Sequence, residues 1–255
     1  MSKPRDYQTE AIIIKKTKLG EADRILTLYT PDLGKIQAKA RGVRRPRSKL
    51  AGHLELLTHS VVSLARGRTL DTVTGSQTID SFLNLKSDLN LTAYALYTAE
   101  LVNQFTVEDV ENRSLFNLLL ETMEHLVQND NKDLVLRFFE LKLLNTAGYR
   151  PQLQQCVSCR QTLKPEVNYF CAGAGGVQCP DCHQIEYSRP ISVNALKVLR
   201  VLQDGDWTLV ARLKIDAELA DELQTVMRYY LGYLLEREIK SATWLDALTN
   251  GFTLR

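Results

Sequence analysis

The sequence predicts an α+β protein in which a small five-stranded β-barrel precedes a helical region with a cysteine-rich insertion. Short β-branched or alternating segments fill the first 80 residues, whereas apolar residues after Phe82 recur at three- and four-residue steps. All five cysteines lie together in an irregular stretch that interrupts the helical pattern. We expect a barrel domain at 1–82, a helical domain at 83–255, and the cysteine-rich segment at about 151–190.

The strands of the predicted barrel are short and separated by turn residues. Thr30-Pro31-Asp32-Leu33-Gly34 has the composition of a tight turn. The segment after it alternates strictly, so that Ile36 and Ala38 point to one face and Lys35 and Lys39 to the other. Five such strands favour a closed or partly open barrel, because closure removes exposed edges. The expected strands are 11–14, 24–29, 35–41, 61–64 and 70–74.

Apolar residues have helical spacing after the predicted barrel, with one interruption by the cysteine-rich segment. Gly148-Tyr149-Arg150-Pro151 ends the third apolar stripe, and the segment that follows is rich in Cys, Gly and Pro. Ser192 is a plausible N-cap where the helical pattern returns. These stripes are typical of core-facing helices. They lie at 94–105, 115–126, 134–141, 196–199 and 219–234.

The net charge of +2 conceals an asymmetry along the chain. Residues 1–80 hold 15 Lys and Arg against 8 Asp and Glu, whereas residues 81–255 hold 17 against 22. A basic module joined to an acidic one indicates that the first binds a polyanion. The N-terminus lacks the apolar core of a signal peptide, and no stretch is long and apolar enough to span a membrane. We therefore expect a cytoplasmic protein.

The positive charge is concentrated in one strand and the loop after it. Seven of the fifteen residues from 35 to 49 are basic, and none is acidic. Such a density of like charge repels itself unless a polyanion relieves it. Nucleic acid is favoured over an anionic membrane, because no amphipathic basic helix accompanies the cluster. The alternative is a loop that is only solvated. The candidate phosphate contacts are Lys35, Lys39, Arg41, Arg44, Arg45, Arg47 and Lys49.

Contacts from lysine and arginine to phosphates give affinity without sequence information. The first 80 residues contain only two aromatic side chains, Tyr7 and Tyr29, so the means to stack bases are sparse. A protein that neutralises the backbone and leaves base edges uncovered would let two single strands pair.

Four cysteines have the spacing of a structural zinc site. Cys156 and Cys159 form one C-x-x-C pair, Cys179 and Cys182 form another, and nineteen residues separate the pairs. Two such pairs supply the four thiolates of a tetrahedral site, which leaves no position open for water. The predicted zinc is therefore structural, and its role is to order a segment with little apolar content. Cys171 and His183 lie close by in sequence, and either is an alternative ligand.

No catalytic motif accompanies these features. The sequence lacks a G-x-x-x-x-G-K-[ST] loop, an H-E-x-x-H motif and a G-x-S-x-G motif, and its four histidines form no recognisable constellation. We expect a protein that is not an enzyme. Two alternatives stay open: a zinc-containing enzyme that processes nucleic acid through an unrecognised carboxylate pair, and a sequence-specific regulator.

The order of these motifs resembles that of the RecO family of bacterial recombination mediators. The resemblance covers nearly the whole chain. It rests on residues 20–28, Gly34-Lys35, residues 40–48, Gly148-Tyr149-x-Pro151, Gly175-Gly176 and the two cysteine pairs.

The resemblance implies an N-terminal OB-fold and a helical domain with an embedded zinc segment. It also implies binding to single- and double-stranded DNA, annealing of complementary strands, and loading of RecA onto DNA coated by single-strand-binding protein, together with RecR and RecF. By this resemblance the DNA contacts would be Lys35, Lys39, Arg41, Arg44, Arg45, Arg47 and Lys49. The zinc ligands would be Cys156, Cys159, Cys179 and Cys182. Cys171 lies outside the family pattern.

Overall fold

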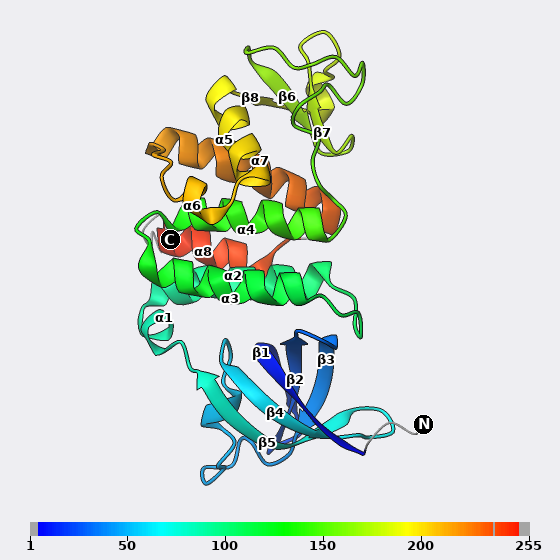
Figure 1. Cartoon of the computed structure of the whole chain (residues 1–255), viewed down its shortest axis with the longest axis vertical. Helices are drawn as coiled ribbons and strands as arrows, with labels where there is room; N and C mark the ends of the chain where they lie inside the picture. The colour runs from blue at the N-terminus through cyan, green and yellow to red at the C-terminus, as the bar shows by residue number, and fades with distance from the viewer. Residues whose placement is uncertain (1–4, 237, 250–255) are drawn as a thin grey trace. The chain divides into compact units, whose positions relative to one another are not determined.

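The computed structural model describes residues 5–236 and 238–249 (Figure 1). They form two compact units. The first contains the described residues up to Val127 and those from Ser241 on, and the second is Gln128–Lys240. We describe each unit by itself.

The first unit begins with a closed five-stranded barrel. Its strands are β1 (Asp6–Leu19), β2 (Asp23–Thr30), β3 (Gly34–Ala40), β4 (His59–Ala65) and β5 (Asp71–Asp80), and a 3₁₀ turn at Gly52–Leu54 precedes β4. The strand order around the barrel is β1-β2-β3-β5-β4. All neighbours are antiparallel except β3 and β5, which pair in parallel over a short stretch.

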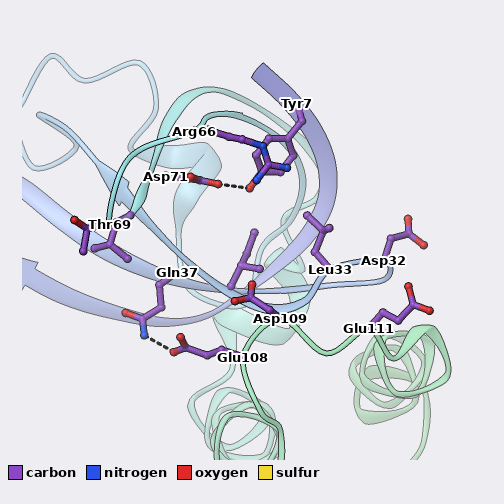
Figure 2. Close-up of a pocket in the computed structure, with 12 residues that line it drawn as sticks. Tyr7, Asp32, Leu33, Gln37, Arg66, Thr69, Asp71, Glu108, Asp109 and Glu111 are labelled. Carbon is purple, nitrogen blue, oxygen red and sulfur yellow. Dashed lines mark hydrogen bonds between the residues drawn. The ribbon is translucent and has the colours of Figure 1, made fainter. Parts of the chain in front are cut away.

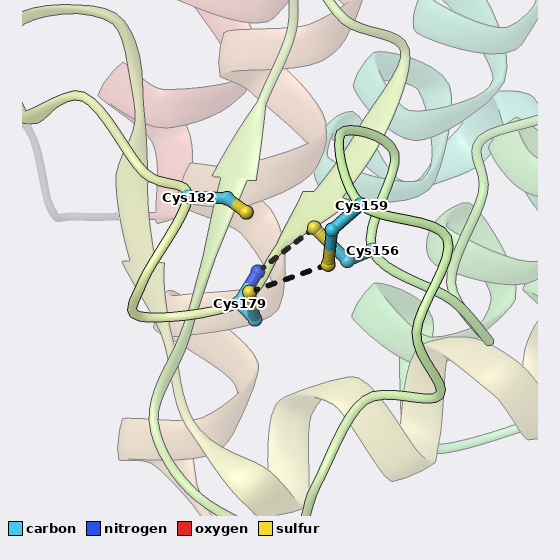
Figure 3. Close-up of side chains that lie close together, drawn as sticks. All are labelled: Cys156, Cys159, Cys179 and Cys182. Carbon is cyan, nitrogen blue, oxygen red and sulfur yellow. Dashed lines mark hydrogen bonds between the residues drawn. The ribbon is translucent and has the colours of Figure 1, made fainter.

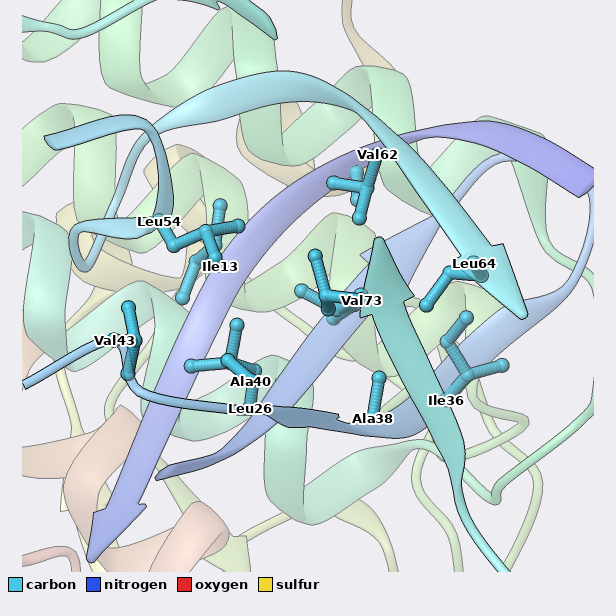
Figure 4. Packing of buried hydrophobic residues seen from close by; sticks show 12 residues of the cluster. Ile13, Leu26, Ile36, Ala38, Ala40, Val43, Leu54, Val62, Leu64 and Val73 are labelled. Carbon is cyan, nitrogen blue, oxygen red and sulfur yellow. The ribbon is translucent and has the colours of Figure 1, made fainter. Parts of the chain in front are cut away.

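The barrel interior is filled by the inward-facing residues of all five strands (Figure 4). On β3 the alternation puts Ile36, Ala38 and Ala40 into this core, as the sequence predicted. Small alanines on β3 lie among larger Leu and Val side chains from the other strands, as in other small barrels whose interiors are filled by side chains. Val43 and Leu54 close the core from the loop between β3 and β4.

The predicted five-stranded barrel is confirmed, but two strands are much longer than expected. β1 covers 14 residues and β5 covers 10. β1 pairs with β4 through its first half and with β2 through its second half, and an irregularity near Ile13 bends it between the two. The added residues are mostly polar and exposed, so they carry no apolar run that would mark a strand in sequence.

Helices complete the first unit. They are α1 (Leu83–Ser87), α2 (Leu89–Phe105), α3 (Arg113–Gln128) and α8 (Lys240–Thr249). Asp88 caps α2 by accepting a hydrogen bond from the Leu91 amide at 3.0 Å. Phe116 of α3 packs against Tyr29 and His59 of the barrel, with ring centroids 6.5 and 5.7 Å apart.

The second unit is built on a core of helices with a small sheet beside it. The helices are α4 (Lys132–Thr146), α5 (Val193–Asp204), α6 (Trp207–Val210) and α7 (Ala217–Leu235). The predicted cap at Ser192 is confirmed, because its hydroxyl accepts from the Ala195 amide at 3.1 Å. Lys142 of α4 donates to the carbonyls of Gln203 and Gly205 and so ties α4 to the end of α5. Among the described helices, none is both long and apolar enough to cross a membrane.

The cysteine-rich segment, expected to be irregular, contains a three-stranded sheet. Its strands are β6 (Asn168–Cys171), β7 (Gly176–Gln178) and β8 (Arg189–Ile191), in the order β7-β6-β8, with a 3₁₀ turn at Ile185–Tyr187 before β8. Strands of three or four residues are too short to show a period of two in sequence.

The predicted domain boundary after residue 82 falls where the barrel ends and α1 begins. The compact units divide later, because α1, α2 and α3 belong with the barrel, and the chain returns to the first unit at Ser241. The Ser241 amide donates to the carboxylate of Glu100 on α2 at 2.7 Å. Whether 1–82 and 83–255 fold as separate domains stays a prediction.

Gly34 lies where the turn between β2 and β3 meets backbone from another part of the first unit. Its φ is +64°, and a Cβ atom there would lie 1.9 Å from the carbonyl oxygen of Val110. Replacing Gly34 by alanine is expected to lower the free energy of unfolding by about 2–5 kcal/mol, since the left-handed conformation and the overpacking both cost stability. Urea denaturation measures this change.

Gly20 offers a matched control for that measurement. Its φ is +60°, but no atom lies within 4 Å of the position of a Cβ. The Gly20→Ala variant should therefore lose only the conformational part, about 1–2 kcal/mol. Equal losses in the two variants would refute the steric argument for Gly34.

Candidate nucleic-acid interface and metal site

The basic loop follows β3 and presents its cations to solvent. The chain leaves β3 at Ala40 and runs through consecutive turns to residue 51. Five of the seven predicted contacts are exposed in this loop. These are Arg41, Arg44, Arg45, Arg47 and Lys49.

Several contacts hold the backbone of this loop in place. The Val43 side chain is only 6% exposed and belongs to the barrel core. The amide of Gly42 donates to the carboxylate of Asp23 at 2.8 Å, and the amide of Arg44 donates to the carbonyl of Ala22 at 2.9 Å. The loop is thus fixed to the β1–β2 turn and the start of β2, while its charged side chains stay exposed.

Lys39 lies at the border between strand and loop and is half-buried. Its ammonium group is 3.1 Å from the carboxylate of Asp23. The pKa of Asp23 is lowered, first by the hydrogen bond from the Gly42 amide and then by Lys39. Asp23 therefore stays ionised and offsets part of the charge of Lys39.

Lys35 is placed differently from the sequence expectation. It is only 9% exposed, and its ammonium group donates to the carbonyls of Asn103 at 2.7 Å and Thr106 at 2.5 Å. The Lys35 carbonyl accepts from the amide of Asp109, so this end of β3 is covered by the segment after α2. Alternation alone put Lys35 on a solvent face. The contact that buries it is about 70 residues away in sequence, so we leave Lys35 out of the interface.

The strand pairing adds two cations that the sequence pattern did not single out. Lys18 of β1 pairs with Arg24 of β2, and Arg24 pairs with Ala40 at the end of β3. The guanidinium of Arg44 donates to the carbonyl of Gly20 at 3.2 Å, which brings the loop against the same β1–β2 turn. In the sequence, both contributed only to the excess of basic residues before position 80, and Arg24 also lies in the run 20–28 that carries the family resemblance.

The two tyrosines of the barrel are occupied by contacts within the protein. Tyr29 is fully buried. Tyr7 donates its hydroxyl to Asp71 at 2.6 Å, and the guanidinium of Arg66 lies over its ring at 4.6 Å (Figure 2). The barrel therefore offers its cations to a ligand without a free aromatic ring beside them.

Tyr7 also lines a pocket of about 660 Å³ whose charge is opposite to that of the basic loop (Figure 2). Among the described residues that line it, Arg66 is the single cation. Five others carry carboxylates, namely Asp32, Asp71, Glu108, Asp109 and Glu111. This balance disfavours phosphate, so the pocket is not part of the proposed DNA interface.

The four predicted metal ligands come together in the second unit (Figure 3). Cys156 and Cys159 precede β6, and Cys179 and Cys182 follow β7. All four sulfur atoms lie within 4.8 Å of one another. The amide of Val157 donates to the carbonyl of Val177 at 2.9 Å, and the amide of Cys179 donates to the sulfur of Cys156 at 3.4 Å. The group can hold a metal ion.

A close approach of two backbone segments explains the glycine at position 176, before the second cysteine pair. The backbone of Gln152 pairs with Gly176, and a Cβ atom at Gly176 would lie 2.4 Å from the Gln152 carbonyl oxygen. The Gln152 amide donates to Gly175, and the Gln152 carbonyl accepts from Val177. These bonds connect the strand of the second cysteine pair to the chain that leads into the first pair.

The thiols of the cluster oppose one another's ionisation. Burial raises the pKa of Cys156, but hydrogen bonds with the backbone of Cys159, Cys179 and Ser158 outweigh it and bring the value to about 6. The neighbouring thiols of Cys179 and Cys159 raise the pKa of Cys182 to about 12. A divalent cation among the four sulfur atoms would relieve this mutual repulsion, because a coordinating thiol is deprotonated.

Neither alternative ligand joins the cluster. Cys171 is buried on β6 outside the group, and His183 is not among the ligand atoms that converge. The ring of His183 stacks on Tyr169, with centroids 3.6 Å apart, and its Nδ1 lies 2.6 Å from the carbonyl oxygen of Pro180. The cysteine spacing thus predicted four residues that the structure brings together. Their role as metal ligands stays a prediction.

Fold and site together define a protein with an OB-like barrel, a helical region and a four-cysteine cluster that can bind a metal. Family models for the N-terminal and C-terminal parts of recombination protein O match residues 1–82 and 86–243. The chain belongs to the RecO family of DNA repair proteins.

Proteins named DNA repair protein RecO are similar over nearly the whole chain. The one from Dehalococcoides mccartyi (strain CBDB1) is 48% identical over 248 residues, which are 97% of this chain and 98% of the relative. The one from Roseiflexus sp. (strain RS-1) is 42% identical over 95% of this chain and 86% of the relative. The one from Pelotomaculum thermopropionicum is 36% identical over 94% and 93%.

Proposed function

We propose that the protein is a recombination mediator that binds single- and double-stranded DNA and anneals complementary strands, without chemistry on the DNA. The observation that carries this proposal is the anchored loop with exposed cations at the end of β3. Its phosphate contacts would be Lys39, Arg41, Arg44, Arg45, Arg47 and Lys49, with Lys18 and Arg24 beside them.

The arrangement of the barrel suits annealing. Cations held on the anchored loop would neutralise phosphates and so reduce the repulsion between two single strands. Both barrel tyrosines are engaged within the protein, so the barrel would not hold bases by stacking on them and would leave the bases free to pair. Contacts of this kind carry no sequence information, which speaks against a sequence-specific regulator.

We propose that zinc occupies the four-cysteine cluster. Four sulfur donors within 4.8 Å suit a tetrahedral zinc ion and leave no ligand position for water or substrate. When bound, the ion would supply a cross-link between the two cysteine pairs rather than reactivity. This cross-link would order the segment that contains β6, β7 and β8.

The resemblance also leads us to propose the partners. We propose that the protein acts with RecR, and with RecF, to load RecA onto single-stranded DNA coated by single-strand-binding protein. The place of this reaction would be the cytoplasm, at the nucleoid.

Annealing of coated strands tests the proposed function. Complementary strands covered by single-strand-binding protein are expected to pair many times faster with the protein than without it, in the absence of any nucleotide cofactor. Labelled strands incubated with the protein and Mg²⁺ should keep their length. Cleavage or extension would support the processing-enzyme alternative, and strong preference for one sequence would support the regulator.

A further inference from the structure

Tyrosines are concentrated in the second unit. Six of the ten tyrosines of the chain lie between residues 149 and 233. Among the described residues, the aromatic side chains that are large and well exposed are Tyr149, Tyr187 and Tyr233, all in this unit. Helical periodicity accounts for the buried side chain of Tyr230 but not for the three exposed tyrosines. The phosphate contacts proposed for the barrel do not involve these three either.

Two of these tyrosines are neighbours of Tyr229, in a group that we call the tyrosine edge. It consists of Tyr187, Arg189, Tyr229 and Tyr233. Tyr229 donates its hydroxyl to the carbonyl of Tyr187 at 2.9 Å, and the guanidinium of Arg189 lies 5.2 Å from the centre of the Tyr229 ring. Tyr233 follows Tyr229 by one turn of α7, on the same side of the helix.

The tyrosine edge is ordered by the sheet of the cysteine-rich segment. Arg189 pairs with Phe170 across β8 and β6, and Phe170 packs on Tyr230 of α7 with ring centroids 5.2 Å apart. The hydroxyl of Tyr233 lies against Gly173, where a Cβ atom would be 3.3 Å from it. Tyr187 is 62% exposed and Tyr233 is 55% exposed.

Arg189 adds a positive charge to this surface. It is exposed, and no carboxylate within residues 5–236 and 238–249 forms an ion pair with it. A cation beside exposed aromatic rings is the pair of groups that binds a single-stranded nucleotide, because a base stacks on the ring while the phosphate meets the charge.

We propose that the tyrosine edge binds unpaired bases of single-stranded DNA by stacking, with Arg189 contacting a phosphate between them. This inference rests on the proposed function and deepens it, since it assigns base contacts to a surface other than the basic loop. Bases inside a duplex are already stacked, so the tyrosine edge would add affinity for single strands alone.

Binding to abasic DNA tests this inference. Fluorescence anisotropy of the full chain is measured with a single-stranded oligonucleotide, an abasic one of the same length, and a duplex. The wild-type protein is expected to prefer the base-bearing strand by about 5-fold to 150-fold for each stacked base. Replacing Tyr187 and Tyr233 together by leucine should abolish this preference and leave duplex affinity unchanged, because leucine keeps apolar contacts but cannot stack.

Three further variants sharpen the test. The variant with phenylalanine at both positions should keep the preference for base-bearing strands. It thereby shows that the protein still folds when both tyrosines are replaced. Tyr149→Leu, an exposed tyrosine outside the edge, should behave like the wild type. Arg189→Gln should weaken binding to both single strands and reduce the dependence of log K on log salt by about 0.7.

The outcomes separate this inference from the function on which it rests. A wild-type protein that binds no single-stranded DNA would contradict both. A wild-type protein that anneals strands but binds base-bearing and abasic strands equally would overturn the tyrosine edge and leave the mediator function standing. The same holds if the leucine variant keeps the preference for bases.

Discussion

Replacing Cys182 by serine is expected to reduce bound zinc from about one ion per chain to nearly none. The apparent binding free energy of a structural zinc is about 10–16 kcal/mol, and it is also folding free energy because the site does not exist in the unfolded chain. A chain that loses the ion also loses this contribution to the order of the cysteine-rich segment. Cys182 is only half-buried, so the loss cannot come from a core cavity. Metal analysis of the purified protein measures the zinc, and limited proteolysis measures the order of residues 151–191.

Cys171→Ala is the matched control for this experiment. Cys171 lies on β6 within the same segment but outside the cluster. The variant should keep its zinc and its resistance to protease near the cysteine pairs. Wild-type protein that contains little zinc when purified without chelator, or a Cys182→Ser variant that keeps a full ion, would contradict the proposed metal site.

Replacing Arg44, Arg45 and Arg47 together by alanine is expected to weaken binding to single-stranded DNA by about a hundredfold at about 0.1 M salt. Each phosphate contact on a single strand contributes about 0.7 to the slope of log K against log salt. If the wild-type loop and its neighbours neutralise about five phosphates, the slope is roughly −3.5, and the triple variant should show roughly −1.4. Titrations at several salt concentrations give both quantities.

A second triple variant separates the loop from the net charge. Lys197, Arg212 and Lys214 are exposed cations in the second unit, and alanine at these positions removes the same three charges. This variant should keep the wild-type slope and lose little affinity. If the two triple variants lose affinity equally, DNA responds to the total charge of the protein and the loop is not the interface.

Stability and affinity respond to different parts of the basic segment. Loss of Lys35 would leave the carbonyls of Asn103 and Thr106 without its ammonium group and should destabilise the first unit. The side chains of Arg44, Arg45 and Arg47 are exposed, and their replacement should leave the free energy of unfolding within about 0.5 kcal/mol of the wild type. Lys35 and Arg45, both basic and ten residues apart, thus have different roles.

Local patterns identified the features that depend on neighbours in the sequence. The alternation of residues 35–41 put Ile36, Ala38 and Ala40 in the core, because side chains of a strand alternate by geometry. Ser192 begins a helix because its own hydroxyl reaches the amide three residues ahead. The two cysteine pairs were recognisable because a C-x-x-C turn brings two thiols to one ion.

The sequence by itself determined the five-stranded barrel, the helical region and the four clustered cysteines, since each follows from periodicity or fixed spacing. The tertiary structure decided which cations are available and which aromatic rings are exposed. Lys35 is buried by residues 103–109, Tyr7 is engaged by Asp71 and Arg66, and Tyr187 and Tyr229 meet although they are 42 residues apart. Burial and ring contacts of this kind depend on distant segments meeting in space, which no local pattern records.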